Sequence, residues 1–148
     1  MDEKSAVEIL LVEDNPYDAE MTIRALKEQD LANNLHVARD GAEALDYLFA
    51  ADGSLKQEKP KVILLDLKLP KVNGLEVLRR IKSDKRAKAI PVVVLTSSNQ
   101  ESDLEECCRL GVNSFITKPV EFESFIKAVS ELGFYWLLLN KMPAASHL

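Results

Sequence analysis

Acidic side chains follow two separate runs of apolar residues in this sequence. Glu13 and Asp14 come directly after the run Ile-Leu-Leu-Val, and Asp66 closes the run Val-Ile-Leu-Leu. Short apolar runs of this kind are typical of buried strands. Carboxylates held together raise one another's pKa, and a hard divalent cation with oxygen ligands relieves the repulsion. The pattern therefore predicts a Mg²⁺ (or Mn²⁺) site that Asp14 and Asp66 bind directly and Glu13 binds through water.

A hydroxyl group and an ammonium group stand at the ends of two further apolar segments. These are the side chains of Thr96 and Lys118. Phosphoryl transfer needs a nucleophile, neutralisation of the phosphoryl oxygens, a fixed cation and a hydrogen-bond donor. Asp66 is the candidate nucleophile, because carboxylates form acyl phosphates. Lys118 and Thr96 are the candidate phosphoryl-binding groups, and the small neighbour Ser97 leaves the hydroxyl room to approach.

Each of these residues has a commoner structural explanation when it is taken alone. Asp14 would favour the following helix through the helix dipole. Thr96 and Ser97 would form a turn, and Lys118 would be a solvated lysine. Phe115 would be a core aromatic residue. The coincidence of these residue types at four strand ends favours the functional interpretation.

The elements that must position these residues alternate along the chain. Strands are expected at residues 8–12, 35–39, 61–66, 91–96 and 113–117. Helices are expected after Asn15, from residue 40 through Phe49, from residue 73, from residues 98–101 to Gly111, and after Pro119. Asp18, Asp40 and Asn73 are interpreted as helix caps. The prediction is an α/β fold, a doubly wound five-stranded parallel sheet of order 2-1-3-4-5 with five helices, which binds ligands at the carboxyl ends of its strands.

Composition limits the classes of function. The chain has 148 residues, 47% of them hydrophobic and 29% charged, which suits one domain with a buried core. A net charge of −5 gives no attraction to nucleic acid or to an anionic membrane. The first residues lack the pattern of a signal peptide, and the longest apolar run, 134–139, is too short to span a bilayer. A cytoplasmic location is expected. The adjacent Cys107 and Cys108 have no metal-binding spacing and are expected to pack in a helix.

Several of these residues occur in one ordered pattern. They are the pair Glu13-Asp14, the segment Asp66-Leu-Lys-Leu-Pro-Lys-Val-Asn-Gly74, the pair Thr96-Ser97 and the pair Lys118-Pro119. Over about residues 7 to 135, this pattern resembles the CheY-like receiver domain of two-component response regulators. The resemblance implies that a sensor histidine kinase transfers a phosphoryl group to Asp66.

The resemblance implies further roles. The backbone carbonyl of Lys68 would complete the Mg²⁺ site, and the bond between Lys118 and Pro119 would be cis. Phe115 would be the aromatic switch residue that rotates inward as Thr96 moves toward the phosphoryl group. Two residues depart from the commonest family pattern: Glu13 replaces an Asp, and Phe115 replaces a Tyr.

A narrower resemblance concerns the segment 41–49 and the expected lack of an output domain. Both features resemble those of small regulators that serve bacterial phytochrome kinases. The resemblance implies a light-sensing kinase as the phosphoryl donor. Residues 7–140 are expected to form the receiver domain and residues 141–148 a tail. The helix after Pro119 carries more apolar residues near its end than one sheet needs. That excess predicts a homodimer through the C-terminal helix, and the alternative is that the helix end folds back on its own domain.

Two rival functions are weaker. A phosphohydrolase with an aspartyl-phosphate intermediate would resemble D-x-D, but Leu67 and Lys68 follow Asp66 without a second acid. A scaffold that needs no phosphorylation would be favoured if Asp14, Asp66 or Lys118 were missing. The expected protein is therefore a phosphoacceptor rather than a turnover enzyme. It assists its own phosphorylation, loses the phosphoryl group slowly and signals to an unidentified downstream protein.

Overall fold

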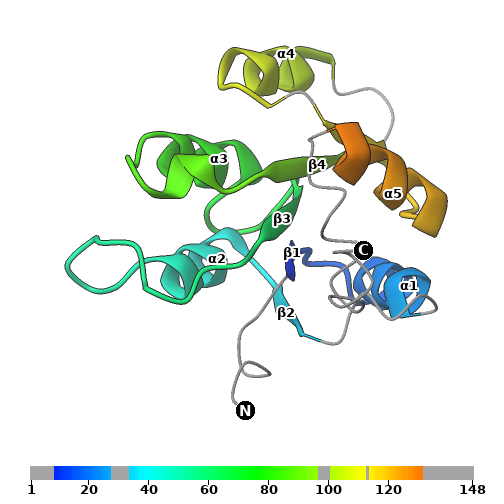
Figure 1. Cartoon of the computed structure of the whole chain (residues 1–148), viewed down its shortest axis with the longest axis horizontal. Helices are drawn as coiled ribbons and strands as arrows, with labels where there is room; N and C mark the ends of the chain where they lie inside the picture. The colour runs from blue at the N-terminus through cyan, green and yellow to red at the C-terminus, as the bar shows by residue number, and fades with distance from the viewer. Residues whose placement is uncertain (1–8, 28–33, 97–100, 113, 132–148) are drawn as a thin grey trace, which may run out of the picture.

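The computed structural model describes residues 9–27, 34–96, 101–112 and 114–131. Its five parallel strands are β1 (Ile9–Val12), β2 (Leu35–Ala38), β3 (Val62–Asp66), β4 (Val92–Thr96) and β5 (Phe115–Thr117). They form one sheet in the order β2-β1-β3-β4-β5. The helices are α1 (Pro16–Lys27), α2 (Gly41–Leu48), α3 (Gly74–Lys82), α4 (Glu101–Arg109), α5 (Phe122–Glu131) and the short 3₁₀ helix η2 (Ala87–Ala89). The predicted fold class and strand order are confirmed (Figure 1).

Alternate residues of the central strands face two separate cores. Leu10, Ile63 and Val94 pack with buried residues of α2, α3 and α4. Leu11 and Leu64 pack with buried residues of α1 and α5 on the other face. A strand covered on both faces must be apolar throughout, which explains the continuous apolar runs in β1, β3 and β4. Figure 1 shows α1 and α5 on one side of the sheet and α2 and α3 on the other.

The register of the strands brings their polar ends to one edge of the sheet. Val12 is paired with Leu65, so the next residues, Glu13 and Asp66, are level with each other. On the other side of β3, Asp66 is paired with Leu95 of β4, and Thr96 is the next residue of β4. Because parallel strands run in the same direction, all of these side chains lie at the carboxyl edge of the sheet.

Helix caps explain where three of the helices begin. Asp40 and Asn73 each accept a hydrogen bond from the backbone N–H three residues later, at 2.7 and 3.0 Å, and so cap α2 and α3 as predicted. Asn15 caps α1 in the same way, by accepting from the backbone N–H of Asp18 at 3.0 Å. The interpretation of Asp18 as a cap was wrong, because its carboxylate accepts a hydrogen bond from Lys118 Nζ at 3.0 Å.

The structure corrects some element boundaries. Helix α2 ends at Leu48, and Phe49 instead forms an isolated antiparallel bridge with Leu55. Leu55 is buried, so the loop between α2 and β3 contains a core residue. After α4, Gly111 has φ +98° and stops the helix where it was predicted to stop. The 3₁₀ helix η2 was not predicted.

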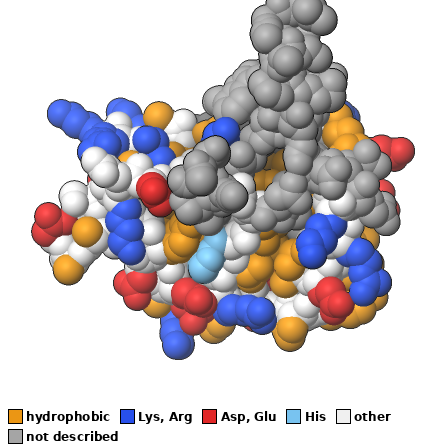
Figure 2. Space-filling model, turned by 60° about the horizontal axis from the view of Figure 1, so that its bottom comes forward, with side chains coloured by type: hydrophobic (Ala, Val, Ile, Leu, Met, Phe, Trp, Pro, Cys, Tyr) orange, Lys and Arg blue, Asp and Glu red, His pale blue; other side chains and the backbone are white. Residues whose placement is uncertain are grey.

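Some predictions fall on residues outside the described ranges. These are the position of Ser97, the strand residue Asn113, the apolar helix end at residues 134–139, the homodimer surface there and the tail at 141–148. Within the described residues, no helix has both the length and the apolar character needed to span a membrane. On the face in Figure 2, acidic and basic side chains of the described residues are interspersed.

Candidate functional site

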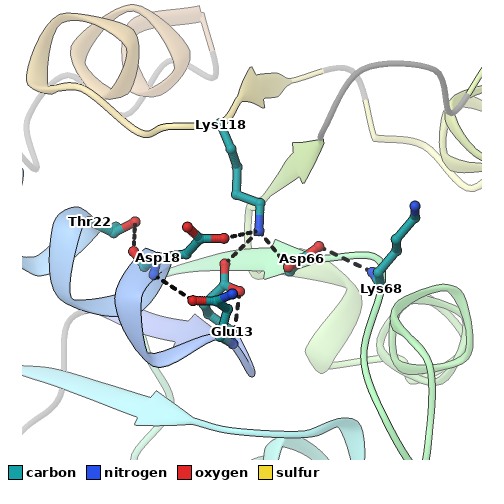
Figure 3. Close-up of polar contacts among 7 residues, drawn as sticks. Glu13, Asp18, Thr22, Asp66, Lys68 and Lys118 are labelled. Carbon is teal, nitrogen blue, oxygen red and sulfur yellow. Dashed lines mark hydrogen bonds and ion pairs between the residues drawn. The ribbon is translucent and has the colours of Figure 1, made fainter.

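The ammonium group of Lys118 lies among three carboxylates. Its Nζ is 2.8 Å from Asp66 Oδ2, 3.0 Å from Asp18 Oδ2 and 3.1 Å from Glu13 Oε1 (Figure 3). The four residues come from the end of β3, the first turn of α1, the loop after β1 and the loop after β5. The fold thus assembles the site from segments up to 105 residues apart in the sequence.

Strand β4 fixes the backbone of Lys118. The N–H of Lys118 donates to the carbonyl oxygen of Thr96 at 2.8 Å, and the bond between Lys118 and Pro119 is cis. Desolvation of the Lys118 side chain lowers its pKa, but the hydrogen bonds to Asp66, Asp18 and Glu13 outweigh it and raise the pKa above the ordinary value. Lys118 is therefore a fixed positive charge.

Glu13 is a buried acid with both oxygens engaged. Its Oε2 accepts from the backbone N–H of Asn15 at 3.2 Å, while Oε1 faces Lys118. Burial, and then the charge of Asp66, raise the pKa of Glu13 to about 7, although the hydrogen bond and the charge of Lys118 act in the opposite direction. The site thus holds more negative charge than Lys118 alone can neutralise.

The loop after Asp66 folds tightly around its carboxylate. Asp66 is buried, and its Oδ1 accepts from the backbone N–H of Lys68 at 3.1 Å. The N–H of Gly74 donates to the carbonyl of Leu67 at 2.9 Å and closes the loop. A Cβ at Gly74 would lie 2.5 Å from the carbonyl oxygen of Asp66, so only glycine fits there. This explains the Gly that ends the segment 66–74.

Three acids are placed where one metal ion can reach them. Glu13, Asp14 and Asp66 each offer an oxygen, and these atoms all lie within 4.8 Å of one another. Asp14 is exposed and lines a cavity of about 400 Å³, together with residues that include Lys68, Asn73 and Asp103. An oxygen-only cluster with excess negative charge suits a hard divalent cation. The residues therefore fit the predicted Mg²⁺ site.

Two other predicted residues lie on β4 and β5, the strands beyond β3. Thr96 is buried at the end of β4. Phe115 is half-buried in β5, opposite Val94 in the register, and packs against the core that includes α3 and α4. Thr96 thus lies at the carboxyl end of β4, one strand from Asp66, whereas Phe115 lies at the start of β5, two strands from Asp66.

Sequence reasoning missed Asp18 as a member of the site. Asp18 is an acid in the first turn of α1, where its effect on the helix dipole is the ordinary explanation, so the sequence carried no separate signal for its place in the site. The backbone of Asp18 is held twice: its N–H donates to Asn15, and its carbonyl accepts from Thr22 Oγ1 at 2.9 Å. Figure 3 shows the Asp18 side chain directed from α1 toward Lys118.

The comparison with known families agrees with this geometry. Residues 9–130 match the response regulator receiver domain, and the chain belongs to that family as a response regulator of two-component signalling. It is 44% identical over 135 residues to the probable methanogenesis regulatory protein FilR2 of Methanothrix harundinacea, covering 91% of this chain and 86% of that protein. It is 39% identical over 137 residues to the response regulator Rcp1 of Synechocystis, covering 93% of each.

Solved structures give the same assignment. The bacteriophytochrome response regulator AtBRR is 54% identical with a TM-score of 0.77, over 88% of this chain and 95% of that one. The phosphorylated cyanobacterial phytochrome response regulator RcpA is 38% identical with a TM-score of 0.70, over 89% and 94%. The receiver domain of the histidine kinase PA1611 from Pseudomonas aeruginosa, with magnesium coordinated in its active-site cleft, is 25% identical with a TM-score of 0.68, over 85% and 96%.

Proposed function

We propose that Asp66 accepts a phosphoryl group from a histidine of a sensor kinase and that the phosphorylated chain signals by binding another protein differently. The observation that carries the proposal is the position of the Asp66 carboxylate, 2.8 Å from a fixed ammonium and within one cluster with two further acids. A nucleophile in that position has a cation ready for the oxygens of an incoming phosphoryl group.

The transfer of the phosphoryl group needs no reactant other than the phosphohistidine donor and a proton from solvent. An oxygen of Asp66 forms a bond to phosphorus, the phosphorus–nitrogen bond of the donor phosphohistidine breaks, and the leaving imidazole nitrogen keeps the electron pair and takes a proton from solvent. Lys118 holds the charge of the phosphoryl oxygens, and the Thr96 hydroxyl is the proposed hydrogen-bond donor from the neighbouring strand. The Phe115 ring then rotates inward as Thr96 moves toward the phosphoryl group, and this rotation changes the surface beside β5.

A divalent ion belongs to the proposal. Asp14 and Asp66 would hold Mg²⁺ directly, Glu13 would hold it through water, and the carbonyl of Lys68 is the proposed fourth contact. Bound Mg²⁺ would neutralise charge on the carboxylates and on the phosphoryl oxygens. The magnesium in the receiver domain of PA1611 supports this assignment.

We propose that the chain is a phosphoacceptor and not a turnover enzyme. The side chains of Leu67 and Lys68 follow Asp66, so the D-x-D arrangement that supplies a general acid and base in phosphohydrolases is missing at these positions. An aspartyl phosphate nevertheless hydrolyses slowly in water. The phosphoryl group is therefore expected to be temporary.

The proposed donor is a phytochrome-type histidine kinase. The support is that AtBRR and RcpA are described as phytochrome response regulators and that each covers more than four fifths of this chain. We further propose a cytoplasmic location and a homodimer through the end of the C-terminal helix. Sedimentation of the full chain would test the dimer, and a monomeric mass at micromolar concentration would contradict it.

Acetyl phosphate with Mg²⁺ tests the phosphoacceptor without the partner kinase. Intact-mass measurement should show one added phosphoryl group on the wild type, none on Asp66→Asn, and none after chelation of the metal. Asp46→Asn, a carboxylate change on α2 outside the site, is the matched control and should be labelled like the wild type. If neither acetyl phosphate nor a phosphorylated histidine kinase labels Asp66, the scaffold that needs no phosphorylation becomes the better account.

A further inference from the structure

All hydrogen-bond donors of the Lys118 ammonium group are engaged in this structure. A lysine side chain carries three N–H donors, and Nζ of Lys118 bonds to three carboxylates, those of Glu13, Asp18 and Asp66. If a phosphoryl group on Asp66 is to bind Lys118, one of these hydrogen bonds must therefore break.

The three carboxylates differ in how easily they can be released. The side chain of Glu13 is 0% exposed and that of Asp66 is 7% exposed, whereas that of Asp18 is 35% exposed. Removing the partner of a buried charge is costly, while a partly exposed carboxylate regains water. Asp66 must also stay beside Lys118, because it carries the phosphoryl group. Asp18 is thus the carboxylate that leaves at the lowest cost.

The backbone around Asp18 allows the side chain to move alone. Its N–H donates to Asn15 and its carbonyl accepts from Thr22, so the first turn of α1 is fixed by bonds that do not involve the carboxylate. Rotation about the side-chain bonds of Asp18 would break its contact with Lys118 and leave α1 intact.

From this geometry we propose that Asp18 is a positioning residue, the ligand that Lys118 exchanges for a phosphoryl oxygen on Asp66. The inference rests on the proposed function. Before phosphorylation, Asp18 holds Lys118 in place and partly neutralises it. During phosphorylation, Asp18 competes with the phosphoryl oxygens for the same ammonium and repels their charge. It therefore weakens the binding of the phosphoryl group and returns to solvent when that group is bound.

Competition by Asp18 makes an unusual prediction, because the loss of a contact should strengthen binding. The probe is beryllofluoride, which binds to a carboxylate with the shape and charge of a phosphoryl group. With saturating Mg²⁺, ¹⁹F NMR of the full chain would give the half-saturating concentration. Asp18→Asn should lower it by about fivefold, the size expected from the loss of one partly exposed ion pair. Asp18→Glu keeps the charge and should bind like the wild type.

Glu20→Gln is the matched control, since it removes a carboxylate from α1 that pairs with Arg24 and not with Lys118. It should change the half-saturating concentration less than about twofold. If Asp18 had a merely structural role, its loss would weaken the binding of beryllofluoride. A half-saturating concentration for Asp18→Asn that is equal to or higher than that of a normally binding wild type would therefore overturn this inference alone. If the wild type binds no beryllofluoride and accepts no phosphoryl group, the proposed function fails and the inference fails with it.

Discussion

Gly41, the first residue of α2, lies against the backbone of Val72 in the loop that follows Asp66. A Cβ at Gly41 would be 1.7 Å from the carbonyl oxygen of Val72. Asp40, just before Gly41, also pairs with Lys71 at 3.5 Å, and Lys71 has φ +67°. The start of α2 therefore supports the loop that shapes the site from the side opposite α1.

Gly41→Ala tests this contact. Because the added methyl group would meet backbone atoms that belong to another element, the free energy of unfolding should fall by about 3 kcal/mol. Gly111→Ala is the contrasting variant: its Cβ would meet nothing within 4 Å, but φ is +98°. The cost there should be about 1 kcal/mol, from backbone strain alone. Urea unfolding measures both, and equal losses would show that contact with Val72 is unimportant.

The stability of the metal-free protein should depend on Glu13. The pKa of Glu13 is about 7 in the folded chain, against 4.5 for the unperturbed group, so the folded state binds this proton more tightly. Its contribution to stability is fully present below about pH 4.5 and is lost as the pH rises through about 7. Glu13→Gln should remove that decline and be more stable than the wild type above pH 7.

The measurement is urea unfolding in the presence of a chelator between about pH 5 and pH 8. Glu43→Gln serves as the control, since this carboxylate caps the start of α2 and is exposed. The same pH slope in Glu13→Gln and in the wild type would contradict the prediction.

Arg80 connects α3 to the loop that follows α2. Its guanidinium carbon lies 3.7 Å from the centroid of the Phe49 ring, and its Nη2 donates to the carbonyl oxygen of Gly53 at 2.8 Å. Arg80→Ala should lower the free energy of unfolding by about 1 to 2 kcal/mol and speed amide hydrogen exchange in residues 50–56. Arg80→Lys should recover little, because an ammonium group cannot make the planar stack and the hydrogen bond together.

The control is Arg24→Ala, which removes an exposed pair with Glu20 within α1. It should cost less than about 0.5 kcal/mol. If Arg80→Ala and Arg24→Ala lower the free energy of unfolding by the same small amount, Arg80 does not stabilise the loop.

The adjacent cysteines should differ in reactivity. Both are free, but Cys107 is buried and Cys108 is exposed. Burial, followed by the charge of Asp103, raises the pKa of Cys107 to about 11, so little thiolate forms near neutral pH. Iodoacetamide should modify Cys108 at least about tenfold faster than Cys107 in the native protein, and both should react in denaturant. Peptide mass spectrometry would show it, and Cys108→Ser should leave the native protein nearly unlabelled.

The fold and the centre of the site could be predicted because both depend on strand ends. A continuous apolar run marks each central strand, and parallel strands bring their carboxyl ends to one edge. Glu13 and Asp66 therefore had to lie close together whatever the details of the loops, and the register confirms it. The sequence prediction that Cys107 packs in a helix also holds, while its neighbour Cys108 faces solvent.

Asp18 and Phe49 could not be predicted in the same way. The contact of Asp18 depends on how α1 docks on the sheet and on a side-chain rotamer, and neither leaves a periodic signal in the sequence. Phe49 continues the apolar spacing of α2, but its backbone is extended with φ −120° and its ring is needed under Arg80. In both cases a tertiary contact overrides the local pattern.

A ribosome synthesises Lys118 after all of the acids that it binds. Lys118 follows Asp66 by 52 residues and Glu13 by 105. During synthesis, the acidic residues emerge long before the cation that pairs with them. A polypeptide released early would hold these acids without their lysine and could not bind a phosphoryl group as the finished protein is proposed to do. Because Lys118 directly follows β5, the acids gain their lysine only when the last strand of the sheet has been made.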